Sequence, residues 1–271
     1  MAGKVSVFDI IQHIYKIPSM LLMILSVYVL IKKIKDISAN FNKQFYTIIV
    51  CKLSNEIAYM VTILIFFKLP KWGFYNNFLV NSNWMATTFY VLMEQQTTFM
   101  FLITFLISTN RYIAVKYPLL YKDYFSKSKI IIILLTFIIS STIIGLGNIP
   151  FNSEYRKFDL HGYFVPFFTS KNVIYYQFFY QVFFYGIISI ATCIFNVRAI
   201  IALKKHNKNV NKFRKELYYI IYSIFIFITI SIVETYFAST IIGLGNIPFN
   251  AEYRKFDLHG YFVPFFTSKN H

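Results

Sequence analysis

Four polar side chains inside apolar runs of the sequence could bind a ligand. They are Glu94, Gln95, Gln177 and Gln181. Carboxylate and amide groups are costly in the hydrocarbon of a membrane, so within a spanning helix they mark candidate functional sites. Arg111 follows Glu94 by about five helical turns, or about 25 Å along a helix. With Arg111 at the inner boundary of the membrane, Glu94 would lie near the outer leaflet. It would face either a pocket open to the outside or the water beyond a helix end, and both readings stay open.

Neighbouring tyrosines complicate the reading of Gln177 and Gln181. They are Tyr175, Tyr176, Tyr180 and Tyr185. Tyrosines at this depth usually form a belt at the membrane–water interface. The two glutamines are one helical turn apart, so we expect them to share a face that could line a cavity.

Catalytic and metal-binding patterns are missing from the sequence. Gly145 and Gly147 lack the third glycine of a phosphate-binding loop, no His-Glu-x-x-His motif occurs, and the five histidines are scattered. Cys51 and Cys193 both lie in apolar runs, where a thiol acts as a small apolar side chain. We therefore predict that the protein is not an enzyme and that it has no cofactor and no metal site.

The composition points to the lipid bilayer as the solvent of these side chains. The 271 residues are 57% hydrophobic, 21% aromatic and only 14% charged, whereas soluble domains carry about 25% charged residues. A net charge of +16 could indicate nucleic-acid binding, but the basic residues are divided among short connections between apolar runs. We predict an integral, all-α membrane protein that does not bind nucleic acid.

Six apolar runs are long enough to cross a bilayer. They cover approximately residues 15–31, 46–67, 85–115, 130–149, 173–203 and 217–242. Lysines and arginines gather after the first, third and fifth runs and are sparser in the other connections. Because positively charged loops stay in the cytoplasm, this alternation predicts an extracellular N-terminus. We expect the protein to lie in the plasma membrane.

An internal repeat limits how the C-terminus can be read. Residues 141–172 recur at 239–270 with one difference, Ser153 against Ala251. A functional array would contain several divergent units, so we interpret the copy as a recent duplication or an error in assembling the coding sequence. Glu252, Arg254 and Asp257 prevent the copy from spanning the membrane. We expect residues 1–238 to form the bundle and 239–271 to be an extracellular tail.

The segment that ends the third apolar run has a recognisable pattern. Arg111 and Tyr112 are followed by Ile113-Ala114-Val115 and then by Pro118, Leu119 and Tyr121. This register resembles the end of the third helix in rhodopsin-like G protein-coupled receptors, with Asn110 in place of the usual Asp.

The wider sequence is most similar to nematode serpentine chemoreceptors of the Srg superfamily, closest to the Srv class. The supporting stretches are Tyr15–Ser19, Lys68–Pro70, Ser108–Tyr112 and Asn148–Phe151, together with Asn196 in the fifth run. The resemblance covers approximately residues 10–238. It implies a seven-transmembrane-receptor-like helical bundle, here with about six spans and without the last one.

The resemblance also implies a function. The chain would be a chemosensory receptor for a small-molecule or peptide ligand and would couple to a heterotrimeric G protein. The coupling residues implied by the match are Asn110, Arg111, Tyr112, Pro118, Leu119 and Tyr121. Arg111 would be the switch, and Leu119 would be the apolar anchor against the G protein.

Three departures from the rhodopsin-like pattern keep other hypotheses open. The sixth run has no proline, no cysteine lies at the top of the third run, and a seventh span is missing. One alternative is a truncated or misassembled receptor product that does not signal. Another is a channel or transporter, although transporter repeats usually comprise several spans each.

Overall fold

A central helix, α5 (Asn83–Lys116), organises the computed structural model of the protein. The structure describes residues 7–36, 40–79, 82–157, 164–170 and 172–206. The predicted sixth span (217–242) and the copied segment (239–271) lie outside these residues. Helix α5 has 34 residues, or about 51 Å at 1.5 Å per residue, and therefore exceeds the ~30 Å hydrocarbon core of a bilayer.

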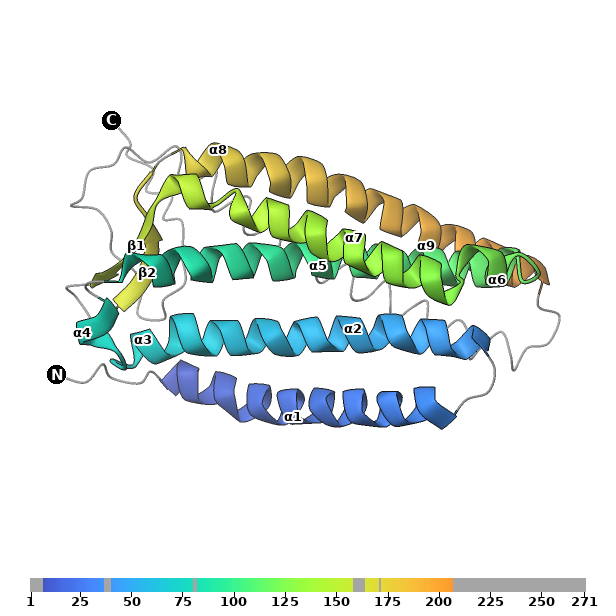
Figure 1. The fold of residues 1–271 in the computed structure, drawn as a ribbon, viewed down its shortest axis with the longest axis horizontal. Coiled ribbons are helices and arrows are strands. Elements are labelled where there is room, and N and C mark those ends of the chain that lie inside the picture. The colour runs from blue at the N-terminus through green and yellow to red at the C-terminus, as the bar shows by residue number, and fades with distance from the viewer. Residues whose placement is uncertain (1–6, 37–39, 80–81, 158–163, 171, 207–271) are drawn as a thin grey trace, which may run out of the picture.

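Three further helices pack against α5: α2 (Asn40–Ile63), α7 (Lys127–Leu146) and α9 (Gly186–His206). Helix α1 (Val7–Asp36) packs against α2 on the side away from α5 (Figure 1). The apolar side chains of α1 are largely exposed, as expected for a helix that meets lipid on most of its surface.

Five of the described helices are long and apolar enough to cross a membrane. They are Ile14–Asp36, Lys43–Lys71, Asn83–Lys116, Lys127–Phe151 and Val173–Lys204. Each contains one of the first five apolar runs of the sequence.

Short elements complete the described chain. The second span continues from α2 through a π-helix (Leu64–Lys68) into α3 (Leu69–Lys71), and α4 (Asn76–Leu79) follows. Helix α6 (Tyr121–Tyr124) connects α5 to α7, and a 3₁₀ turn (Ile149–Phe151) follows α7. The fifth span consists of α8 (Val173–Phe178), a second π-helix (Phe179–Tyr185) and α9.

A β-hairpin lies at one end of the bundle, on the side where α1 begins (Figure 1). Strands β1 (Ser153–Lys157) and β2 (Phe164–Phe168) pair antiparallel, with Ser153 opposite Phe168. The hydroxyl of Tyr155 donates to the carbonyl oxygen of Phe66 at 2.6 Å. That carbonyl belongs to the first π-helix, so the hairpin is fastened to the second span where its hydrogen-bond pattern is irregular.

The hairpin is also bound to the start of α5. The hydroxyl of Tyr90 donates to the carbonyl oxygen of Pro166 at 2.9 Å, and the Tyr90 ring stacks on Phe168 with centroids 3.7 Å apart. Burial raises the pKa of Tyr155, mainly through loss of hydration, so its hydroxyl stays protonated and can donate.

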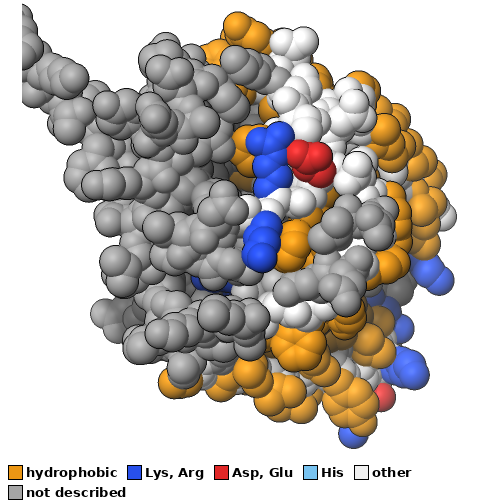
Figure 2. Space-filling view, turned by 90° about the vertical axis from the view of Figure 1, so that its left-hand side faces the viewer, with side chains coloured by type: hydrophobic (Ala, Val, Ile, Leu, Met, Phe, Trp, Pro, Cys, Tyr) orange, Lys and Arg blue, Asp and Glu red, His pale blue; other side chains and the backbone are white. Residues whose placement is uncertain are grey.

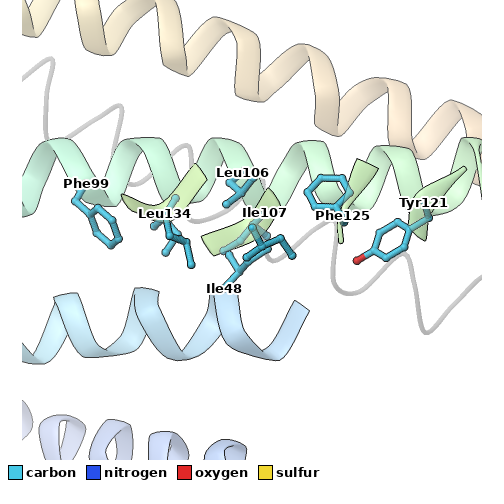
Figure 3. Packing of buried hydrophobic residues seen from close by; sticks show 9 residues of the cluster. Ile48, Phe99, Leu106, Ile107, Tyr121, Phe125 and Leu134 are labelled. Carbon is cyan, nitrogen blue, oxygen red and sulfur yellow. The ribbon is translucent and has the colours of Figure 1, made fainter. Parts of the chain in front are cut away.

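At the other end of the bundle, an apolar core joins α2, α5 and α7 to the connection that contains α6. Its buried members are Ile48, Phe99, Ile103, Leu106, Ile107, Tyr121, Phe125, Ile130 and Leu134. Figure 3 shows Ile48 and Leu134 meeting the α5 side chains, with Tyr121 and Phe125 at the end of the cluster. The connection after α5 is therefore packed into the bundle.

Close approach of α7 to α5 depends on Gly145. A Cβ atom at this position would lie 2.6 Å from the carbonyl oxygen of Val91 on α5. Small residues at such crossings let membrane helices pack backbone to backbone. The contact brings Thr142 of α7 against Gln95, whose Nε2 donates to the Thr142 hydroxyl at 3.1 Å.

Candidate functional site

Glu94 of α5 is surrounded by hydroxyl groups from the fifth span. Tyr180 donates its hydroxyl proton to one carboxylate oxygen of Glu94, and Tyr185 donates to the other. The Tyr185 oxygen also lies 2.8 Å from the Thr98 hydroxyl. Either hydroxyl of this pair can be the donor. We call Glu94, Thr98, Tyr180 and Tyr185 the Glu94 cluster.

The second π-helix explains how both tyrosines reach one carboxylate. Tyr180 and Tyr185 are five residues apart, which in an α-helix would place them about 140° apart around the axis. The wider turn of a π-helix returns residues five apart to the same face. Such segments are rare and occur frequently at functional sites.

Aromatic packing holds the tyrosines in place. Tyr185 stacks on Phe101 with ring centroids 4.4 Å apart and an interplanar angle of 7°. The Tyr176 and Tyr180 rings meet at an angle of 64°, with centroids 5.0 Å apart. The Tyr176 hydroxyl donates to the carbonyl oxygen of Ile144 on α7, so the three helices are joined around the cluster.

The expectation of an interface belt is wrong for Tyr180 and Tyr185, which are 4% and 1% exposed. Tyr175 is 77% exposed, which is compatible with a place in an interface belt. The sequence did not single out the two buried tyrosines, because a spacing of five residues matches no face of an α-helix. That irregular spacing beside an intramembrane glutamate is the one signal that could have identified them.

Among the described residues, no hydrogen bond or ion pair joins the other three candidate pocket residues to Glu94. Gln95 is bound to Thr142. Gln181 has a buried Oε1 without a hydrogen-bond partner in the described part of the chain, and Gln177 is partly buried. The structure therefore brings Glu94 together with tyrosines instead of with these glutamines.

A second polar arrangement lies in the second span, where Lys52 and Glu56 form the ion pair expected from their spacing. Lys52 Nζ is 3.3 Å from Glu56 Oε1. Nearby, Asn55 Nδ2 donates to the carbonyl oxygen of Gln96, and Gln96 Nε2 donates to the Thr62 hydroxyl, both at 2.9 Å. These contacts fix α2 against α5, and we assign them a structural role.

At the opposite end of α5, the residues of the Asn-Arg-Tyr pattern point to three different neighbours. Asn110 is buried, and its Nδ2 donates to the Tyr121 hydroxyl at 2.9 Å. The guanidinium carbon of Arg111 lies 5.8 Å from the centre of the Phe45 ring on α2. Tyr112 is buried in a cluster with Ala199 and Leu203 of α9.

The connection that follows α5 exposes apolar side chains. Leu119 is 92% exposed, and Pro118 beside it is also exposed. Further exposed apolar side chains surround Leu119: Tyr117, Leu120 and Tyr124. Tyr121 points the other way, into the core (Figure 3). The end of α5 therefore has a buried anchor, Asn110 with Tyr121, and an exposed apolar surface centred on Leu119.

Five apolar spans, of which the central helix α5 packs against three others, define an integral membrane protein of the helical-bundle class. The sequence model of the family described as serpentine type 7TM GPCR chemoreceptor Srv matches residues 12–254. Since the match covers most of the chain, the protein belongs to this family of chemoreceptors. The resemblance to the Srv class is thereby confirmed. The match names the Srv family itself and not the wider Srg superfamily. No curated protein matches the chain.

Proposed function

We propose that this chemoreceptor binds an external ligand at the Glu94 cluster and couples to a heterotrimeric G protein through residues 110–121. The observation that carries the coupling half is the exposure of Leu119. Leu119 is 92% exposed and lies among the exposed side chains of Tyr117, Leu120 and Tyr124, and a contiguous apolar patch of this kind is typical of an interaction site. Basic side chains flank it on the same connection, at Lys116, Lys122, Lys127 and Lys129.

Arg111 is the proposed switch. Its guanidinium stays charged at all physiological pH values and has five donors, so it can contact backbone carbonyls of a partner. The contact with the Phe45 ring supports a resting position against α2. Asn110 is uncharged, so it cannot form the charge pair with Arg111 that an Asp would form. It donates a hydrogen bond to Tyr121 instead, and this bond holds the connection after α5 in place.

Nucleotide exchange on a purified G protein tests the coupling half without a known ligand. The full chain is placed in lipid nanodiscs, and basal exchange is measured with the wild type, Leu119→Ala and Arg111→Ala. Loss of the apolar anchor should reduce exchange about tenfold, which corresponds to about 1.4 kcal/mol. Phe74→Ala is the matched control, because Phe74 is an exposed apolar residue at the hairpin end. Unchanged exchange in Leu119→Ala would contradict the proposal.

A second candidate is a receptor product without signalling, which the near-verbatim repeat of residues 141–172 at 239–270 favours. It predicts no exchange on any G protein, even with the wild-type chain. Transcript sequence across Ser239 separates the two candidates. An additional apolar segment there would support the receptor, and a stop codon directly after His271 would support the silent product.

A further inference from the structure

The Glu94 carboxylate has no basic partner among the described residues. In that part of the chain, Lys52 is paired with Glu56 and Arg156 with Glu154. Both Glu94 oxygens are hydrogen-bonded to tyrosine hydroxyls, which are neutral groups and leave the carboxyl without a compensating positive charge. An ionised carboxylate within a membrane span is costly unless a cation compensates it.

We propose that the Glu94 cluster binds an organic ammonium group, and that this group is the recognised part of the external ligand. The inference rests on the proposed ligand site at Glu94 and names the chemical class that this site accepts.

Aromatic rings around the carboxylate supply the second half of the recognition. The Tyr180 and Tyr185 rings have centroids 5.6 Å apart and meet at 70°, and Tyr176 is inclined to Tyr180 by 64°. The three rings are therefore inclined to one another instead of stacked. Ring faces attract ammonium groups through their quadrupole, and aromatic cages recognise methylated ammonium ions by this means.

A metal ion fits the cluster less well than an ammonium group. Hard cations such as Ca²⁺ take six to eight oxygen ligands, usually from several carboxylates and carbonyls. In the described part of the chain no group of three His, Cys, Asp or Glu side chains could hold a metal ion. The remaining oxygens of the cluster belong to neutral hydroxyls. Anionic ligands are excluded because Glu94 would repel them.

Glu94 is the least buried member of the cluster. Glu94 keeps partial exposure, whereas both tyrosines that donate to it are buried. One helical turn before Glu94, Tyr90 is bound to the hairpin through Pro166, so the cluster lies just below the hairpin end of the bundle. Figure 2 shows that end, where acidic and basic side chains lie side by side instead of forming a surface of one sign.

Thermal unfolding of the full chain in nanodiscs tests the proposal with three probes of similar size. They are tetramethylammonium, the neutral tert-butanol and the anionic trimethylacetate. A ligand that binds only the folded state raises the melting temperature in proportion to its occupancy. We expect a saturable rise with tetramethylammonium alone, and at least about tenfold weaker binding for Glu94→Gln, which removes the charge but keeps the shape.

Further variants keep the test decisive if Glu94→Gln folds poorly. Glu94→Asp retains the charge and should retain a response, and Tyr180→Phe retains the ring and should weaken binding less than Tyr180→Leu does. Tyr175→Phe is the matched control, because Tyr175 is exposed and outside the cluster. An equal response to tert-butanol, or an unchanged response in Glu94→Gln, would overturn the proposal. The assay contains no G protein, so its failure leaves the coupling test at Leu119 unaffected.

Discussion

Asn110 donates a buried hydrogen bond to Tyr121, and this contact gives the residue before Arg111 a defined role. Asn110 is 2% exposed, and the Tyr121 ring stacks on Phe125 with centroids 5.2 Å apart. Burial raises the pKa of Tyr121, while the hydrogen bond from Asn110 opposes that shift. A buried amide that loses its only described acceptor carries the full cost of its desolvation. The contact therefore holds the connection after α5 against the core.

Removing the Tyr121 hydroxyl tests that role. Tyr121→Phe keeps the ring in the core but leaves Asn110 Nδ2 without its acceptor, so we expect a loss of about 1–3 kcal/mol in the free energy of unfolding. Tyr124→Phe should change stability very little, because Tyr124 is exposed. Thermal unfolding in nanodiscs measures both variants. Equal melting temperatures for the two would show that the Asn110–Tyr121 bond does not anchor the connection.

At the scale of elements, the π-helix Phe179–Tyr185 sets the register of the whole fifth span. It acts as a one-residue insertion, so that Tyr180 and Tyr185 face Glu94 while Ala199 and Leu203 further along still meet Tyr112. Each residue turns an α-helix by about 100°. A regular α-helix of the same sequence could satisfy one of these two contacts but not both.

Deletion of single residues tests this reading of the fifth span. Without Val182, an exposed residue in the π-helix, the two tyrosines become four residues apart in a regular α-helix and keep one face. We therefore expect the deletion of Val182 to lower stability by no more than about 1–2 kcal/mol. Deleting the equally lipid-facing Ile190 rotates the two halves of the span against each other and should cost more than about 4 kcal/mol. Similar melting temperatures for both deletions would contradict the interpretation of the π-helix as a one-residue insertion in the fifth span.

For the molecule as a whole, the two ends of the bundle differ in charge and structure. Lys33 and Lys35 end α1 at the same end as α6, and Lys116, Lys127 and Lys129 lie at the ends of α5 and α7 near it (Figure 1). The opposite end carries the hairpin, where Arg156 is paired with Glu154 at 2.7 Å. The positive-inside rule therefore predicts that the lysine-rich end is cytoplasmic and that the N-terminus is outside.

Cysteine labelling tests this orientation. In a background with Cys51→Ala and Cys193→Ala, one variant carries Phe74→Cys at the hairpin end and another carries Leu119→Cys at the lysine-rich end. Both positions are exposed. A membrane-impermeant maleimide should label the Phe74→Cys variant on intact cells, and the Leu119→Cys variant only after permeabilisation. The reverse pattern would place the N-terminus in the cytoplasm and would remove Leu119 from the G protein side.

The class of the protein follows from the sequence alone. In lipid, a long apolar run can form all its backbone hydrogen bonds only as a helix, so the sequence predicts the spanning helices. Lysines that gather in alternate connections predict the orientation of these helices in the membrane. The Asn110–Tyr121 pattern is local and contiguous, and it therefore identified the receptor class. The Lys52–Glu56 pair was likewise readable, because neighbours four apart share a helix face.

Only the tertiary structure decided what surrounds Glu94. Its partners are 86 and 91 residues away in the chain, and they face it through a π-helix that no regular period predicts. Gln95 was a reasonable candidate by depth, but the crossing at Gly145 turns it to Thr142. The hairpin that binds Phe66 and Tyr90 was also invisible in a loop without a clear strand pattern. Contacts between distant segments depend on how helices rotate and cross, and that information lies in their packing.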